Sequence, residues 1–111
     1  MQGREFTEVS RVPEEADEYV LDREMGCTRA DFVRWLPGAT GHAPSRIEMD
    51  RVTVEFAGGI IEISFLQALA RKIGLISIPV LNVSFRFLGV GAAARSEFMT
   101  YFDLYTKRGG G

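Results

Sequence analysis

The stretch RIEMDRVTVEFAGGIIEISF, residues 46–65, decides the fold of this chain. Apolar and polar residues alternate in three short runs within it, at 46–49, 52–56 and 61–65. Alternation with a period of two is typical of a strand with one buried face and one face in water. The adjacent glycines at 58–59 are a strong signal for a two-residue hairpin loop, and Asp50-Arg51 is a weaker one. The stretch therefore predicts an antiparallel meander.

The two predicted loops can be checked against each other through the strand register that each imposes. The loop at 58–59 predicts the pairs Phe56–Ile61, Val54–Ile63 and Val52–Phe65, and the loop at 50–51 predicts Met49–Val52 and Ile47–Val54. All of these apolar residues then share one face of the sheet. A slip of one residue would move a whole strand's apolar set to the opposite face. Both loops therefore predict the same buried face.

A helix is predicted before the meander. Thr28 can accept a hydrogen bond from the N–H of Asp31, and Asp31 can reach back, as in a capping box. Cys27 before the cap and Phe32 after it are placed to form a hydrophobic staple. An apolar stripe follows at Phe32, Val33, Trp35 and Leu36. Proline and glycine at 37–38 weaken the helix, and Gly41 ends it at the latest.

After the meander, residues 67–72 are predicted as a helical turn or a loop. Residues 73–88 indicate one long strand or two strands, because apolar and polar residues alternate from 81 to 87. Pro79 has no N–H to donate, which predicts an edge, a bulge or a break. Residues 92–105 predict an amphipathic helix, with its apolar stripe at Ala94, Phe98, Tyr101, Phe102 and Tyr105.

These elements predict an α+β fold, an antiparallel meander sheet of about four strands with one helix before it and one after it. Both helices are expected to pack on the apolar sheet face. A length of 111 residues and a hydrophobic fraction of 46% suit one domain with a modest core. We place that domain at residues 25–108. Residues 1–24 are expected to be a largely extended or mobile N-terminal arm, and 109–111 a flexible end.

Composition argues against several classes of partner and location. A net charge of −2 disfavours a duplex nucleic-acid partner, because such binders concentrate positive charge. The longest apolar-rich stretch, residues 73–88, is interrupted by polar residues and does not predict a membrane span. The single cysteine cannot form an internal disulfide, and the first ten residues lack a secretory pattern. We therefore expect no nucleic-acid partner, no membrane and a cytoplasmic location.

The polar positions of the meander predict a charged row on the sheet face opposite the core. The register above places Arg46 opposite Glu55, and Glu55 opposite Glu62. Arg86 occupies a polar position on the following strand. Opposed carboxylates are unfavourable unless neutralised or solvated, and such a pair can share a proton or bind a cation. The simpler interpretation is a solvated face with ion pairs worth ~0–1 kcal/mol each.

Two further candidate sites have equally simple interpretations. Cys27 and His42 flank the first helix and could pair as nucleophile and base, or bind a soft metal together with Met25. Cys27 already has a structural interpretation as the staple residue, so no metal is predicted. Tyr101 is a candidate ligand-binding residue, because the tip of an amphipathic aromatic can emerge at the rim of a core.

The sequence contains no phosphate loop, no metal-spaced cysteine pair and no second histidine, so no cofactor is predicted. The leading hypothesis is a non-enzymatic protein-binding or assembly module, including self-association as a homodimer. It rests on Ile76, Ile78 and Val80, because this region has more apolar residues than one core face absorbs. The alternative is a small-ligand-binding protein or enzyme with a groove between sheet and helices, using Glu55, Glu62 and Arg86.

Overall fold

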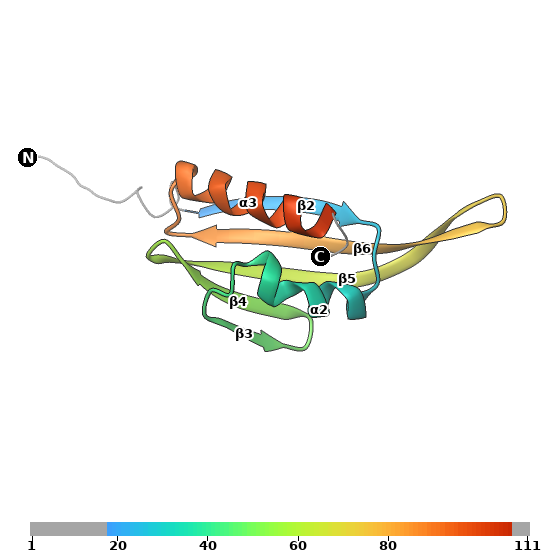
Figure 1. Ribbon diagram of the computed structural model, residues 1–111, viewed down its shortest axis with the longest axis horizontal. Coiled ribbons are helices and arrows are strands. Elements are labelled where there is room, and N and C mark those ends of the chain that lie inside the picture. The colour runs from blue at the N-terminus through green and yellow to red at the C-terminus, as the bar shows by residue number, and fades with distance from the viewer. Residues whose placement is uncertain (1–17, 108–111) are drawn as a thin grey trace, which may run out of the picture.

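The computed structural model describes residues 18–107, which form one antiparallel sheet with two helices on the same face (Figure 1). Along the chain the elements are β2 (Glu18–Met25), α2 (Arg29–Ala39), β3 (Ser45–Glu48), β4 (Arg51–Phe56), β5 (Gly59–Ile73), β6 (Ile76–Leu88) and α3 (Ala92–Lys107). The strand order is β2-β6-β5-β4-β3. The predicted α+β class, with one helix before the meander and one after it, is confirmed. The sheet has five strands where about four were predicted.

The additional strand is β2, which comes from the end of the predicted N-terminal arm. It pairs antiparallel with β6, from Glu18 opposite Leu88 to Met25 opposite Leu81. Most of its side chains are exposed, because β2 is an edge strand. Its sequence therefore has little hydrophobic periodicity to reveal it. The rest of the predicted arm, residues 1–17, and the predicted flexible end at 109–111 lie outside the described residues.

Both predicted hairpin loops lie one residue earlier than expected. The β4–β5 loop is Ala57-Gly58, so Phe56 faces Gly59 and Val54 faces Ile61. The β3–β4 loop is likewise shifted, and Ile47 faces Val52. Each shift moves the pairing partner by two residues along its strand. A shift of two preserves the face on which each strand residue lies, so the predicted apolar face of β4 and β5 survives although the pairs do not. Met49 is the exception, because it lies in the β3–β4 loop and is 83% exposed.

The β5–β6 hairpin is longer than predicted. Residues 67–72, expected as a helical turn or a loop, continue β5 as far as Ile73. The register of β5 against β6 shifts between Ala68 and Arg71, opposite Pro79. A bulge at this point accommodates a residue that cannot donate to the ladder.

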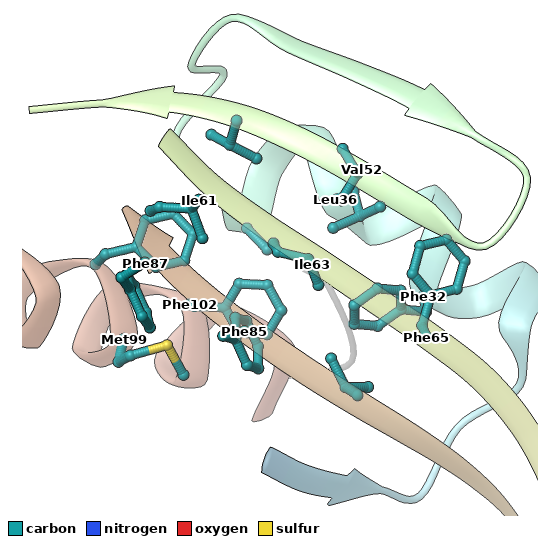
Figure 2. Packing of buried hydrophobic residues seen from close by; sticks show 14 of the residues in the cluster. Phe32, Leu36, Val52, Ile61, Ile63, Phe65, Phe85, Phe87, Met99 and Phe102 are labelled. Carbon is teal, nitrogen blue, oxygen red and sulfur yellow. The ribbon is translucent and has the colours of Figure 1, made fainter. Parts of the chain in front are cut away.

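The core lies between the sheet and the two helices (Figure 2). Phenylalanine rings connect the layers: Phe32 of α2 lies 5.0 Å from Phe65 of β5, and Phe102 of α3 lies 5.0 Å from Phe85 of β6, between ring centroids. Phe32 and Phe102 also pack against each other, which joins the two helices.

The predicted cap of α2 is present. Asp31 N–H donates to Thr28 Oγ1 at 3.1 Å, and Cys27 and Phe32 on either side are both buried in the core. The helix continues past Pro37 to Ala39, and the chain leaves it through Gly41 with a φ of 65°. A positive φ here is the usual reason for glycine after a helix.

Candidate functional site

The predicted row Arg46–Glu55–Glu62 does not exist, because the two loop shifts change its members. Arg46 faces Thr53, Thr53 faces Glu62, and Glu55 faces Ile60. Glu55 and Glu62 are therefore not opposed, and the predicted carboxylate pair is wrong. The error arises from reading Gly59 as a loop residue when it is the first residue of β5.

Arg86 is the residue that organises the charges on this outer face. Its Nε donates to Glu18 Oε2 at 2.7 Å, and one of its terminal nitrogens donates to Glu62 Oε1 at 3.4 Å. The hydrogen bond and charge of Glu18 raise the pKa of Arg86, with a smaller contribution from Glu62. Arg86 thus links β2, β6 and β5 as a permanently charged bridge. All three side chains contact water, so we interpret this cluster as a solvated structural ion-pair group.

A shallow hollow of about 730 Å³ lies beside that bridge on the same outer face. Its floor is made of short polar side chains on adjacent strands: Ser64 faces Ser84, and Ser84 faces Asp22. The surrounding residues are Arg23, Glu24, Asp50, Arg51, Phe65, Leu66, Asn82 and Val83. The predicted ligand residues Glu55, Glu62 and Arg86 do not line the hollow. Hydroxyl, amide and carboxylate groups here can bind small polar molecules but provide no evident nucleophile.

Tyr101 lies away from the charged residues, on the helix side of the molecule. It lines a hollow of about 310 Å³, together with Thr40, Gly41, Ala43, Phe56, Glu97 and Phe98. Its ring is half exposed, with Tyr105 one helical turn away at 6.4 Å between centroids. The structure therefore does not bring Tyr101 together with Arg46, Glu55, Glu62 or Arg86.

Cys27 and His42 lie at opposite ends of α2. Eleven helical residues separate the two ends by roughly 16 Å. Cys27 is buried, and burial, with a smaller effect of Asp31, raises the pKa of its thiol. Both observations disfavour the nucleophile pair. Within residues 18–107, histidine, cysteine and acidic side chains form no group of three that could hold a metal ion.

The most distinctive surface is the end of the β5–β6 hairpin, which extends beyond the rest of the sheet (Figure 1). The last β5 residue paired with β4 is Ser64, and the last β6 residue paired with β2 is Leu81. Residues 68–80 therefore pair only within the hairpin, and we call them the distal hairpin. It exposes four large apolar side chains: Leu69 (93%), Ile73 (57%), Leu75 (106%) and Ile76 (62%).

The three predicted interface residues lie on this hairpin in different environments. Ile76 is exposed, Ile78 is half-buried, and Val80 is 5% exposed at the base. The sequence analysis missed Leu69, Ile73 and Leu75. The available signal was Gly74-Leu75, a two-residue loop flanked by Ile73 and Ile76, which face each other. It was missed because residues 67–72 were not recognised as a strand.

Gln67 anchors the base of the distal hairpin. Its Oε1 accepts the backbone N–H of Arg29 at 2.7 Å, and its Nε2 donates to Val80 O at 2.8 Å and to Cys27 O at 3.4 Å. One side chain thus joins β5, β6 and the first residue of α2. Arg71, further along β5, donates to Glu24 of β2 at 2.8 Å.

Comparison with known proteins returns no matching family model, curated protein or solved structure. Among the described helices, none has the length and apolar character needed to cross a membrane. Function must therefore be argued from the geometry of the chain itself.

Proposed function

We propose that this chain is a small non-enzymatic protein-binding or assembly module that contacts its partner through the distal hairpin. The observation that carries the proposal is the exposure of Leu69, Ile73, Leu75 and Ile76 on a single protruding element. Large apolar side chains gathered on one exposed element mark interaction surfaces, whereas scattered ones are ordinary.

Folding of the core does not require these side chains. None of residues 66–79 belongs to the core cluster, and Val80 at the base is the one buried residue of the distal hairpin. A two-stranded hairpin by itself is marginally stable in water and gains stability from further strands or a packed surface. A partner would supply both, which supports an assembly role.

The test is site-specific photo-crosslinking in the native host, with the photoreactive residue at position 75 of the full chain. The matched control places it at position 104, because Leu104 of α3 is also an exposed leucine, at 52%. We expect a discrete protein adduct from position 75 and none from position 104. Equal labelling at both positions, or no discrete adduct from position 75, would overturn the proposal.

A second candidate function is binding of a small polar ligand in the outer-face hollow. Its support is the floor of Ser64, Ser84 and Asn82, where short side chains leave about 730 Å³ open. Ser84→Leu fills this floor and is expected to abolish binding of such a ligand in a fragment screen by NMR. Shifts that persist in Ser84→Leu would exclude the hollow as the site.

A further inference from the structure

The two edges of the distal hairpin differ in how open they are. On the β6 edge, Pro79 has no N–H to offer a new strand. The chain leaving β2 also passes close to this edge at Gly26. A Cβ atom added to Gly26 would lie 3.8 Å from the Ile78 side chain and 4.0 Å from Pro79 O. Proline and a covering loop are known ways of blunting an edge strand. A new strand is therefore disfavoured on β6.

On the β5 edge, no described strand covers residues 68–73, where a bulge at 69–70 interrupts the ladder to β6. Up to Phe65 it is occupied, because Phe65 N–H donates to Asp50 O at 2.9 Å on the side where β4 lies. Gln67 is held by α2 through Arg29. Beyond it, β5 continues to Ile73, and none of the strands described within residues 18–107 lies on that side. A strand added here would continue the sheet in the position that β4 takes nearer the core.

The open backbone favours a protein strand over a lipid surface as the occupant. The distal hairpin has Arg71, Lys72 and no acidic residue, a composition that also suits an anionic membrane. In the hydrocarbon region, however, unpaired strand edges leave backbone N–H and C=O groups without partners. A protein strand satisfies these groups and covers the apolar side chains at the same time.

We infer that the occupant is a second copy of this chain, joined β5 edge to β5 edge in antiparallel orientation about a two-fold axis. This inference rests on the proposed assembly function. The same edge on both copies is self-complementary, as a two-fold interface requires. The two hairpins then form one four-stranded sheet, which is above the size at which a sheet becomes independently stable.

The charges of the hairpin specify the antiparallel direction. Parallel strands in register would place Arg71 and Lys72 of one copy beside the same residues of its partner, which is unfavourable. Antiparallel strands point each basic pair toward the base of the other hairpin. Asp50 flanks that base, bonded through its carboxylate to Arg29 at 3.3 Å and exposed to solvent. Arg71 is further neutralised within its own chain by Glu24.

The first experiment compares a positive with a negative charge introduced at Ala70 on the open edge. We expect Ala70→Lys to weaken self-association of the full chain about tenfold, measured by sedimentation across micromolar concentrations, because lysine adds to the basic pairs across the interface. Ala70→Glu is expected to weaken it less than Ala70→Lys, because the basic residues at 71–72 partly neutralise the two glutamates that face each other. Both variants should unfold at the same urea concentration under conditions in which all proteins are monomeric, because Ala70 lies outside the core.

Disulfide trapping in a Cys27→Ala background tests the geometry of the interface. With the two-fold axis between the two copies of Ala70, Ala70→Cys should crosslink them, because opposed Cα atoms in an antiparallel pair lie about 4.5–5.5 Å apart. Ser77→Cys lies on β6, and the two copies of it are separated by three strand spacings, or roughly 14 Å. It should not crosslink. Equal crosslinking of both variants, or trapping of Ser77→Cys alone, would overturn the β5 interface.

The outcomes distinguish failure of this inference from failure of the proposed function. If the wild-type chain stays monomeric while position 75 still crosslinks to a different protein, the homodimer inference is wrong. The proposed binding function is then retained. A monomer with no adduct overturns both. Binding to vesicles of anionic lipid that Ala70→Lys strengthens and Ala70→Glu weakens identifies a membrane as the occupant, because the effect of the added lysine is then reversed.

Discussion

Adjacent glycines at positions 58 and 59 have different physical roles in the β4–β5 hairpin. Gly58 has a φ of 79° and lies in the loop, where a positive φ favours glycine. Gly59 is in β5, where a Cβ would lie 2.5 Å from Leu88 O and 2.6 Å from Gly89 O. The first glycine therefore makes the turn, and the second lets two backbones approach closely.

Gly59→Ala should destabilise the fold by about 1–3 kcal/mol, because rigid backbone carbonyls cannot move aside for the methyl group. Urea unfolding of the variant measures this change. The control is Gly26→Ala, whose new Cβ meets only ordinary contacts at 3.8 Å and beyond. We expect it to stay within about 0.5 kcal/mol of the parent. Similar losses in both variants would contradict the close-approach argument.

Cys27 makes the stability of the fold depend on pH in the alkaline range. Burial raises its native pKa, whereas an unfolded chain has a thiol pKa of about 8.5. Above the unfolded value the native state binds more protons than the unfolded state, so the free energy of unfolding falls as pH rises. The contribution is fully present below about pH 8.5 and is lost as pH rises toward the native pKa.

We expect Cys27→Ala to show a smaller loss of unfolding free energy than the parent between about pH 7 and pH 9.5, in urea titrations at both values. Its absolute stability should be lower at neutral pH, because the substitution removes a buried sulfur atom. The comparison is therefore of slopes. Identical slopes in the two proteins would mean that Cys27 does not contribute to the alkaline loss.

At the scale of elements, the strength of the distal hairpin depends on its attachment at Gln67. Gln67→Met removes all three hydrogen bonds of the side chain and should make the amides of residues 68–73 and of Arg29 exchange faster with solvent. The local opening free energy should fall by about 1–2 kcal/mol. Hydrogen-exchange NMR measures it residue by residue.

Gln67→Glu separates the two halves of this attachment. The carboxylate can still accept from Arg29 N–H, but it loses the donor to Val80 O and Cys27 O. We expect Arg29 to remain protected while the hairpin amides exchange faster. If both variants leave hairpin exchange unchanged, the strand pairing alone holds the hairpin, and Gln67 is incidental.

Local signals predicted most elements correctly, and they failed where a distant contact decided the outcome. The cap at Thr28, the two helices and the common apolar face follow from neighbouring residues alone. The register did not, because the role of Gly59 depends on Leu88 and Gly89 in another strand. The distal hairpin was not predicted for a related reason. Its β5 strand lies outside the core, so residues 67–72 show no clear alternation of apolar and polar residues.

Across the whole molecule, the pairing of β2 with β6 joins the first described strand to the last. Three contacts between distant segments support it: Arg23 with Asp103 of α3, Arg86 with Glu18, and the guanidinium of Arg95 3.9 Å from the ring centre of Tyr19. Charged residues at these positions have no periodic signature. The sequence therefore predicted which charged residues lie on this face but not how they pair. The ion pair between Arg86 and Glu18 is the main example.

A core that lies outside the distal hairpin predicts that the hairpin can be removed without loss of the fold. Ala68 and Val80 face each other directly, so Asn-Gly in place of residues 69–79 gives a two-residue hairpin loop. Because none of the removed residues belongs to the core cluster, the unfolding free energy of the shortened chain should lie within about 1 kcal/mol of that of the parent monomer.

The shortened chain should also lose self-association completely while keeping its NMR spectrum over the rest of the sheet, measured by sedimentation and by amide shifts. A matched variant with serine in place of Leu104 alters an exposed leucine outside the hairpin and should associate like the parent. If the shortened chain fails to fold, the hairpin belongs to the folding unit. If it folds and still self-associates, the contact lies elsewhere on the body, and the β5 edge is not the interface.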